Sequence, residues 1–242
     1  MTIAILGLRS GSKGIPDKNI KHLHNKPLFY WILRTIFASK VYDDVIVSSD
    51  SSVYLSLVGE FFPNVFLHHR STRNSTDVSV EYDFILEALD YFDLHSRLIM
   101  SDEIISRFHA TSPLQSVSDI KESVDALVGD LSATSSVLIR PSPIHPHKTL
   151  VLQSHSDSTI ALCSSSLTCE AVTPRNRQTL APHYIRSNII NFKKSTLDSR
   201  SLTGHKCLAV LSDSDIHVDI DSPLDFMFAD YIIRNNIKDL LS

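Results

Sequence analysis

Apolar runs of strand length alternate with amphipathic segments through about the first 130 residues of the chain. The run Ile3–Leu8 is continuously apolar, as expected of a strand that is buried on both faces of a parallel sheet. Two further strands are predicted at Asp44–Ser48 and Glu103–Phe108, and a shorter one at Asn64–His68. Helices are predicted between them, at residues 28–38, 51–61 and 78–92. This alternation predicts an α/β fold, a three-layer Rossmann-like sheet whose ligands bind at the carboxyl ends of its strands.

The pattern changes after a helix predicted to begin at Ser116, which stands three residues before Asp119 as in a capping box. Short strands separated by prolines and serine-rich turns, at residues 132–140, 149–154 and 159–163, predict a β-rich insertion over about residues 140–180. Strands at residues 184–192 and 206–211 follow, and Ser222 and Pro223 are suited to begin a last helix. We therefore expect one domain, residues 1–242, that carries a small β-rich arm.

The composition is that of an ordinary globular protein, with 43% hydrophobic and 21% charged residues. The formal net charge of −4 argues against nucleic acid or an anionic membrane as a partner. No apolar run approaches the roughly 20 residues of a membrane span. The cysteines are odd in number and lack C-x-x-C spacing, which favours reduced thiols and a cytoplasmic protein; they are Cys163, Cys169 and Cys207. A polyanionic ligand would therefore need a local cluster of positive charge.

The loop after the first strand, residues 7–19, contains such a cluster. It has three glycines, and its basic side chains are Arg9, Lys13 and Lys18. Glycine lets backbone N–H groups approach phosphate oxygens, and basic side chains offset phosphate charge. The spacing matches neither the Walker loop nor the dinucleotide-binding G-x-G-x-x-G motif. The loop predicts phosphate binding, with a solvated polar turn as the alternative.

A second feature, Asp219-Ile220-Asp221, stands near the end of the chain. If this segment is extended, both carboxylates lie on one face while Val218 and Ile220 pack on the other. Adjacent carboxylates repel each other unless a cation lies between them, so the pair predicts a magnesium site. A polar strand end before a capped helix is the alternative. Together, the basic loop and the carboxylate pair suit in-line displacement at the phosphorus of a nucleoside triphosphate.

With these pieces the sequence resembles the acylneuraminate (CMP-sialic acid) cytidylyltransferases, which include enzymes for legionaminic and pseudaminic acids. The matching segments run in family order along the whole chain. They are Arg9-x-x-Ser12-Lys13-Gly14-Ile15-Pro16-x-Lys18-Asn19, Ile46-Val47-Ser48-x-Asp50, Arg70 with Asp77, Thr111-Ser112-Pro113-Leu114, His145-Pro146-x-Lys148-Thr149, Arg177-Gln178 and Asp219-Ile220-Asp221.

The resemblance implies a reaction in which the anomeric hydroxyl of an acidic nine-carbon sugar attacks the α-phosphate of CTP and pyrophosphate leaves. It implies that the nucleotide is held by Arg9, Ser12, Lys13, Lys18, Asn19 and Arg70. Asp219 and Asp221 would bind Mg²⁺, with Lys13 and Asp221 acting in catalysis. It further implies a homodimer in which the β-rich arm crosses to the partner, so that Lys148 and Arg177 reach the sugar carboxylate. The proton acceptor is open between a carboxylate and a metal-bound water.

The chain departs from the family pattern at several places. Leu8 replaces an alanine where the backbone nears the nucleobase, and Glu81 stands where serines are usual. His109 and Ser187 replace a glutamine and an asparagine that face the sugar, and are therefore expected to contact the substrate. We hypothesise a cytidylyltransferase for a nonulosonic acid other than the commonest sialic acid. Two alternatives are a D-x-D glycosyltransferase that uses a nucleotide sugar, and a non-catalytic nucleotide-binding paralogue.

Overall fold

The computed structural model describes residues 1–76, 78–146, 150–156, 159–164, 181–214 and 216–237. The chain forms two compact units, which we describe separately. The larger unit comprises Met1–Leu138 and Asn188–Ser242, and the smaller unit comprises Ile139–Ser187.

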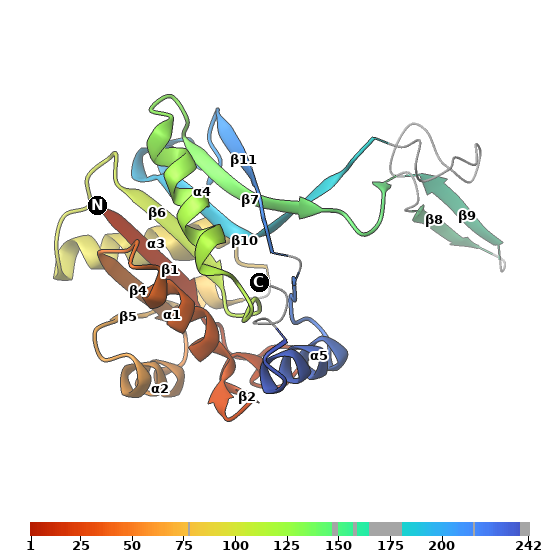
Figure 1. Cartoon of the computed structure of the whole chain (residues 1–242), viewed down its shortest axis with the longest axis horizontal. Coiled ribbons are helices and arrows are strands. Elements are labelled where there is room, and N and C mark those ends of the chain that lie inside the picture. Colours follow the sequence, from red (N-terminus) through yellow and green to blue (C-terminus); the bar gives the residue numbers. More distant parts are fainter. Residues whose placement is uncertain (77, 147–149, 157–158, 165–180, 215, 238–242) are drawn as a thin grey trace. The chain divides into compact units, whose positions relative to one another are not determined.

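A seven-stranded sheet forms the centre of the larger unit, in the order β11-β7-β10-β6-β1-β4-β5 (Figure 1). Four strands, β1 (Thr2–Gly7), β4 (Asp44–Ser49), β5 (Phe66–His69) and β6 (Ile104–His109), pair in parallel. Next to β6, β10 (Tyr184–Lys193) is antiparallel. The sheet ends with β7 (Ser135–Pro141) and β11 (Cys207–Leu211). The predicted α/β fold with a mostly parallel central sheet is confirmed.

Helices cover both faces of this sheet. One apolar cluster joins α1 (Leu28–Ser39), α2 (Ser52–Phe61) and α4 (Val117–Gly129) to the side chains of Ala4, Leu6 and Val47. Figure 1 shows α1 and α4 in front of the sheet and α3 (Glu81–His95) behind it. The continuous apolar runs of β1 and β4 follow from this arrangement, because alternate side chains enter opposite helical layers.

Capping residues set several helix ends. The side chain of Ser116 accepts a hydrogen bond from the first turn of α4, as the sequence predicts. Ser51, expected to be the first residue of its helix, is instead the residue that caps α2. A full capping box between Ser222 and Asp225 begins α5 (Pro223–Arg234). The start of α3 was predicted wrongly, at Val78 rather than Glu81. The backbone N–H of Thr76 donates to the Ser79 hydroxyl at 2.9 Å. Because this side-chain hydrogen bond stabilises a turn, the helix begins after it.

Short elements complete the larger unit. The first loop leads into η1 (Lys18–Ile20) and a small hairpin of β2 (His22–Leu23) and β3 (Lys26–Pro27). Two 3₁₀ turns, η2 (Thr72–Ser75) and η5 (Lys194–Ser199), follow β5 and β10.

The smaller unit contains an antiparallel pair, β8 (Leu150–Ser156) and β9 (Thr159–Ser164), close to the predicted short strands.

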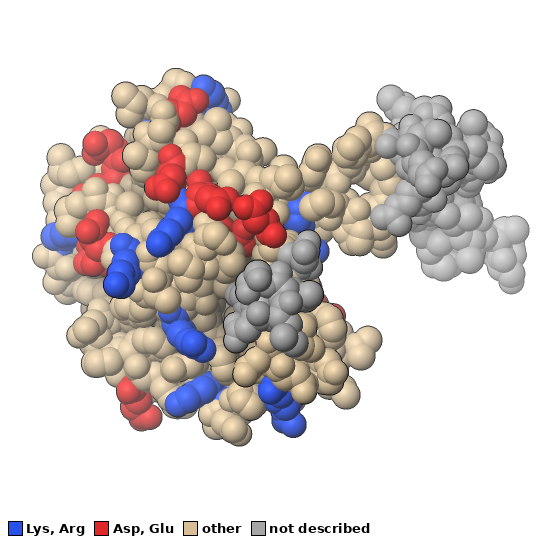
Figure 2. Space-filling view, in the orientation of Figure 1, with Lys and Arg blue, Asp and Glu red and all other residues tan. Residues whose placement is uncertain are grey.

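Charges on the surface are mixed in sign. Figure 2 shows acidic side chains gathered in a band over the region that carries α4. The helix α4 itself carries Glu122 and Asp125. Burial, and then repulsion by Asp213 and other acidic neighbours, raises the pKa of Glu122 above its ordinary value. This region would repel a polyanion. None of the described helices is long and apolar enough to cross a membrane.

Candidate functional site

A cleft of about 330 Å³ lies at the carboxyl ends of β1, β5 and β6. Three segments form its wall: the loop after β1, the segment between β5 and α3, and the residues at the end of β6. The lining residues are Gly7, Arg9, Ser12, Lys18, Asn19, Arg70, Asn74, Thr76, Ser79, Glu81, Phe84, His109, Ala110 and Thr111. This is the end of a parallel sheet where α/β proteins bind their ligands. The structure therefore brings six of the predicted site residues together: Arg9, Ser12, Lys18, Asn19, Arg70 and His109.

The first loop is tied down at both ends. Asp50, just after β4, accepts hydrogen bonds from the Ser10 backbone N–H at 2.8 Å and the Ser10 hydroxyl at 2.7 Å. Burial tends to raise the pKa of Asp50, but these hydrogen bonds outweigh it and hold the pKa below its ordinary value. Asn19 donates from its side-chain amide to the Arg9 carbonyl at 2.9 Å. The loop that carries Arg9 is thus held in shape by groups on β4 and η1 before any ligand binds.

Arg70 is a buried cation in the cleft wall. Its Nε and Nη2 atoms donate to the Oγ and carbonyl oxygen of Ser48 at 3.1 and 3.0 Å. The guanidinium also lies 4.0 Å from the ring centre of Phe84. Burial lowers the pKa of Arg70 to about 10, partly offset by Asp50 and Glu87, so the group stays charged at neutral pH. Gly7 makes this possible, since a Cβ there would lie 2.8 Å from Arg70 Nη2.

The segment that carries the carboxylate pair lies against the first loop. Val218 and Ile220 are buried while Asp219 and Asp221 are exposed, which is the predicted alternation. Lys18 Nζ donates to the Ile220 carbonyl at 2.5 Å and lies 3.5 Å from Asp221 Oδ1. Lys18 also lines the cleft, so it links Asp221 to the basic wall.

Two exposed carboxylates on one face are a donor set that suits a hard divalent cation, because Mg²⁺ is commonly held by one or two carboxylates together with substrate phosphates. Asp219 and Asp221 provide that set. Among the described residues, no group of three or more His, Cys, Asp or Glu side chains is placed to hold a metal by itself. The residues therefore fit a magnesium ion that is shared with a phosphate ligand.

The remaining predicted residues lie elsewhere. Lys13 is exposed in the first loop and is not one of the cleft-lining residues. Ser187 lies on β10 and belongs to the smaller unit. Lys148 and Arg177 lie outside the described residues.

The side chain of Leu8 lies away from the cleft. The sequence left open whether a side chain larger than alanine here would affect the fit of the nucleobase, and the structure places it fully buried in the apolar cluster that joins α1 and α2. Leu8 continues the parity of Ala4 and Leu6, whose side chains enter the same helical layer. The cleft is therefore not narrowed by this substitution.

Sequence reasoning missed several residues of the cleft. Asn74, Thr76 and Ser79 line it with hydroxyl and amide groups; Asp50, which stood in a matching segment without an assigned role, shapes it. Polar residues before a predicted helix give a weak signal for the first three. Glu81 was noted only as a departure, yet its carboxylate lies 3.1 Å from His109 Nε2 and 2.9 Å from Arg107 Nε.

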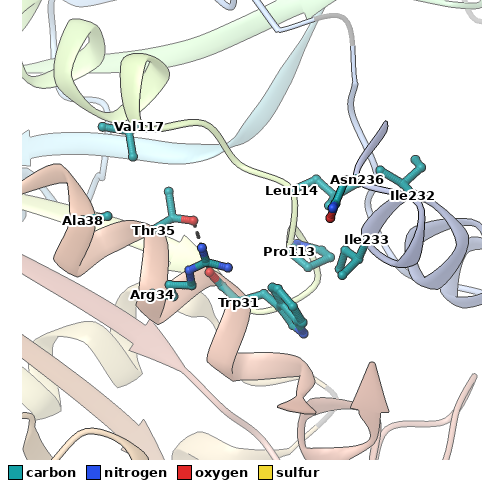
Figure 3. A pocket seen from close by; sticks show the side chains of 10 residues that line it. All are labelled: Trp31, Arg34, Thr35, Ala38, Pro113, Leu114, Val117, Ile232, Ile233 and Asn236. Carbon is teal, nitrogen blue, oxygen red and sulfur yellow. Dashed lines mark hydrogen bonds between the residues drawn. The ribbon is translucent and has the colours of Figure 1, made fainter. Parts of the chain in front are cut away.

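A second pocket, of about 280 Å³, lies between α1, the loop after β6, and α5. Figure 3 shows Trp31, Pro113 and Ile233 projecting toward it. Arg34 is the one charged side chain among the residues that line it. The cleft at the strand ends, lined by Arg9, Lys18 and Arg70 with Glu81 as the one acidic side chain, is much better suited to a polyphosphate.

The fold and the basic cleft at the carboxyl ends of its parallel strands are those of an α/β protein that binds a ligand at this edge of the sheet. A family model described as cytidylyltransferase matches residues 3–197, and the chain belongs to this family. The resemblance seen in the sequence is thereby confirmed.

The chain is 27% identical to N-acylneuraminate cytidylyltransferase of Streptococcus agalactiae serotype V over 96% of its own length. It covers 54% of that relative, so it spans about half of that protein's length. It is 22% identical to post-translational flagellin modification protein B of Campylobacter coli, covering 93% of this chain and 92% of that one.

Among solved structures, CMP:2-keto-3-deoxy-manno-octonic acid synthetase complexed with CTP superimposes with a TM-score of 0.68. The match covers 97% of this chain and 99% of the other, at 12% sequence identity. At this identity the likeness concerns the fold.

Proposed function

We propose that the chain transfers CMP from CTP to the anomeric hydroxyl of an acidic nine-carbon sugar and releases pyrophosphate. One observation carries the proposal: a basic cleft at the strand ends is joined through Lys18 to an exposed carboxylate pair. Family membership and the name of the Streptococcus agalactiae relative agree with it.

The residues of the cleft would act mainly by position and charge. Arg9 and Lys18 from the first loop and Arg70 after β5 converge on the cleft, where they would offset the charge of the triphosphate. Little covalent chemistry is required of the protein in phosphoryl-type transfer, so fixed cations and an aligned hydroxyl supply most of the effect. The hydrogen bonds to Asp50 and Ser48 fix two of these positions in advance, which avoids reorganisation during the reaction.

Magnesium belongs to the proposal, and Asp219 and Asp221 would hold it. When bound, it would offset charge on the phosphates of CTP. Lys18 would keep Asp221 oriented beside the first loop.

The sugar proposed is a nonulosonic acid other than the commonest sialic acid, because His109 and Glu81 give this wall a chemistry different from the usual glutamine and serines. We also propose a homodimer, in which the smaller unit would reach a partner, and a cytoplasmic location. The free thiol of the exposed Cys207 agrees with a reducing compartment.

The proposal is tested by pyrophosphate release from CTP and Mg²⁺ with a panel of sialic, legionaminic, pseudaminic and octulosonic acids. We expect release with a nine-carbon acid and about a 10²-fold loss of rate in Asp221→Asn, because a carboxylate that would hold the metal is removed. Asp198→Asn removes an exposed carboxylate elsewhere and serves as the matched control.

Three results would contradict the proposal. Absence of CTP-dependent release with every acid would remove the enzymatic activity, and absence of CTP binding by calorimetry would indicate a non-catalytic paralogue. Sugar transfer from a nucleotide sugar without pyrophosphate would indicate a glycosyltransferase. Sedimentation of the intact chain tests the dimer separately.

A further inference from the structure

Three charged or titratable side chains meet at the edge of the cleft. His109 ends β6, and Arg107 lies two residues earlier on the same face of that strand. Glu81 is the first residue of α3. One carboxylate oxygen, Glu81 Oε1, lies 3.1 Å from His109 Nε2 and 2.9 Å from Arg107 Nε. Neither β6 nor α3 alone would predict this arrangement.

The Glu81 contact fixes which nitrogen of the imidazole carries the proton. An ionised carboxylate only accepts hydrogen bonds, so Nε2 must donate. In the neutral ring the lone pair is then on Nδ1, the nitrogen that does not face Glu81. Arg107, whose side chain is buried, offsets the charge of Glu81 and keeps the carboxylate in place. His109 itself is 41% exposed and lines the cleft, so a ligand can reach it.

Cations also surround His109 in the cleft: Arg9 and Lys18 from the first loop and Arg70 after β5 line the same wall, where they would attract anionic substrates. The carboxylate of Glu81 lies at the nitrogen of the imidazole that is turned away from a ligand on Nδ1. An imidazole that is oriented by a carboxylate through one nitrogen and takes a proton on the other is the arrangement used to activate hydroxyl nucleophiles.

We propose that His109 is the general base of the reaction and that Glu81 and Arg107 are its positioning residues. The inference rests on the proposed function. As the anomeric oxygen forms its bond to the α-phosphorus of CTP, its proton passes to His109 Nδ1. The bond from the α-phosphorus to the bridging oxygen breaks, and pyrophosphate leaves with that electron pair. The imidazolium then returns the proton to solvent.

The decisive experiment compares wild type with His109→Gln, Glu81→Gln and His205→Gln in pyrophosphate release over a range of pH. Glutamine stands at this position in the family pattern; it preserves hydrogen bonding to a sugar but cannot accept a proton, so it separates a base that is particular to this chain from a binding group. We expect kcat of His109→Gln to fall by about 10²-fold to 10³-fold, with the acid limb of its pH profile lost. CTP affinity, measured by calorimetry, should stay within about twofold, because the triphosphate contacts are intact.

Glu81→Gln should lower kcat less, because the base is still present and only the carboxylate that orients its ring is lost. His205 is an exposed histidine before β11, and His205→Gln should match wild type. His109→Ala should regain part of its rate when imidazole is added, which a purely structural residue would not do. Circular dichroism on each variant checks the fold.

The inference is overturned if His109→Gln keeps kcat within about threefold of an active wild type, or raises KM while leaving the pH profile unchanged. In either case the cytidylyltransferase activity itself stands, because wild type still releases pyrophosphate. If wild type releases none with any acid of the panel, the proposed function fails and the inference fails with it.

Discussion

Glycines make the closest approaches in the site. A Cβ placed on Gly14 would lie 2.6 Å from the backbone carbonyl oxygen of Asp221. A backbone atom cannot relieve such a clash by changing rotamer, as a side-chain atom can. This glycine therefore allows the first loop and the carboxylate pair to lie together. The same contact lets Lys18 reach both the cleft and Asp221.

We predict that Gly14→Ala separates these two segments. The apparent affinity for CTP with Mg²⁺ should fall about 10-fold or more, because part of the binding energy is used to re-form the contact. Calorimetric titration of the variant with CTP measures the change. Gly129→Ala is the matched control, since a Cβ at Gly129 meets nothing within 4 Å. Equal CTP affinity in the two variants would show that Gly14 has no such role.

At the scale of elements, the site depends on how β4 holds the loop after β1. Asp50, just after β4, accepts hydrogen bonds from Ser10 in the loop after β1. The conformation of this loop therefore depends on both neighbouring strands. The low pKa of Asp50 shows that the native state favours its ionised form.

We predict that Asp50→Asn loosens this loop without changing the fold. Asparagine keeps one acceptor but loses the charge, and hydrogen bonds to a charged group contribute about 1.5–3 kcal/mol against about 1 kcal/mol for neutral ones. CTP affinity should therefore fall about 3-fold to 10-fold, with a small loss of stability. Calorimetry and urea denaturation measure both quantities. Asp198→Asn, an exposed carboxylate, should change neither.

Elements of this protein were far easier to predict than contacts between them. The strand β1 and the centre of β4 stand out in the sequence as apolar runs. Ser51, Ser116 and Ser222 mark helix starts through local hydrogen bonds. The alternation of burial around Asp219 and Asp221 was predictable from the period of two of an extended segment, although the structure forms no sheet strand there. All of these depend on neighbours in the sequence.

The errors and omissions have a different origin. The pairing of Glu81 with His109 joins residues 28 positions apart on different elements, so no local pattern encodes it. The stacking of Arg70 on Phe84 likewise requires β5 and α3 to be packed first. The question left open at Leu8 could have been answered from the sequence, because its parity with Ala4 and Leu6 already indicated the helical layer.

In the molecule as a whole, the two ends of the parallel strands have different roles. The carboxyl ends of the strands form the cleft. At their amino ends, Arg97 joins its own segment after α3 to the starts of β4 and β6. It donates from Nε to Asp44 at 2.9 Å and from Nη1 and Nη2 to Glu103 at 2.9 Å each. These acids stand at or just before the first residues of β4 and β6. We call these contacts the Arg97 clamp. It holds the amino ends of β4 and β6 together, at the edge of the sheet opposite the cleft.

This clamp should make stability depend on pH. Burial tends to raise the pKa of Glu103, but hydrogen bonds from Arg97 and the Met100 N–H outweigh it and hold the pKa below its ordinary value of 4.5. A carboxyl with a lowered folded-state pKa stabilises the fold above its unfolded pKa. That contribution is lost as pH falls from about 4.5 through the folded-state pKa.

We predict that Glu103→Gln is less stable than wild type by about 1–3 kcal/mol at neutral pH, because the buried acid loses charged hydrogen bonds to Arg97. The difference should shrink as pH falls below about 4.5, where the wild-type carboxyl itself takes up a proton. Urea denaturation at a series of pH values measures the free energy of unfolding of each protein. Asp102→Asn changes an exposed acid next to Glu103 in the sequence and should stay within about 0.5 kcal/mol of wild type throughout. A difference between Glu103→Gln and wild type that is the same at every pH would mean that shape, not charge, makes Glu103 part of the clamp.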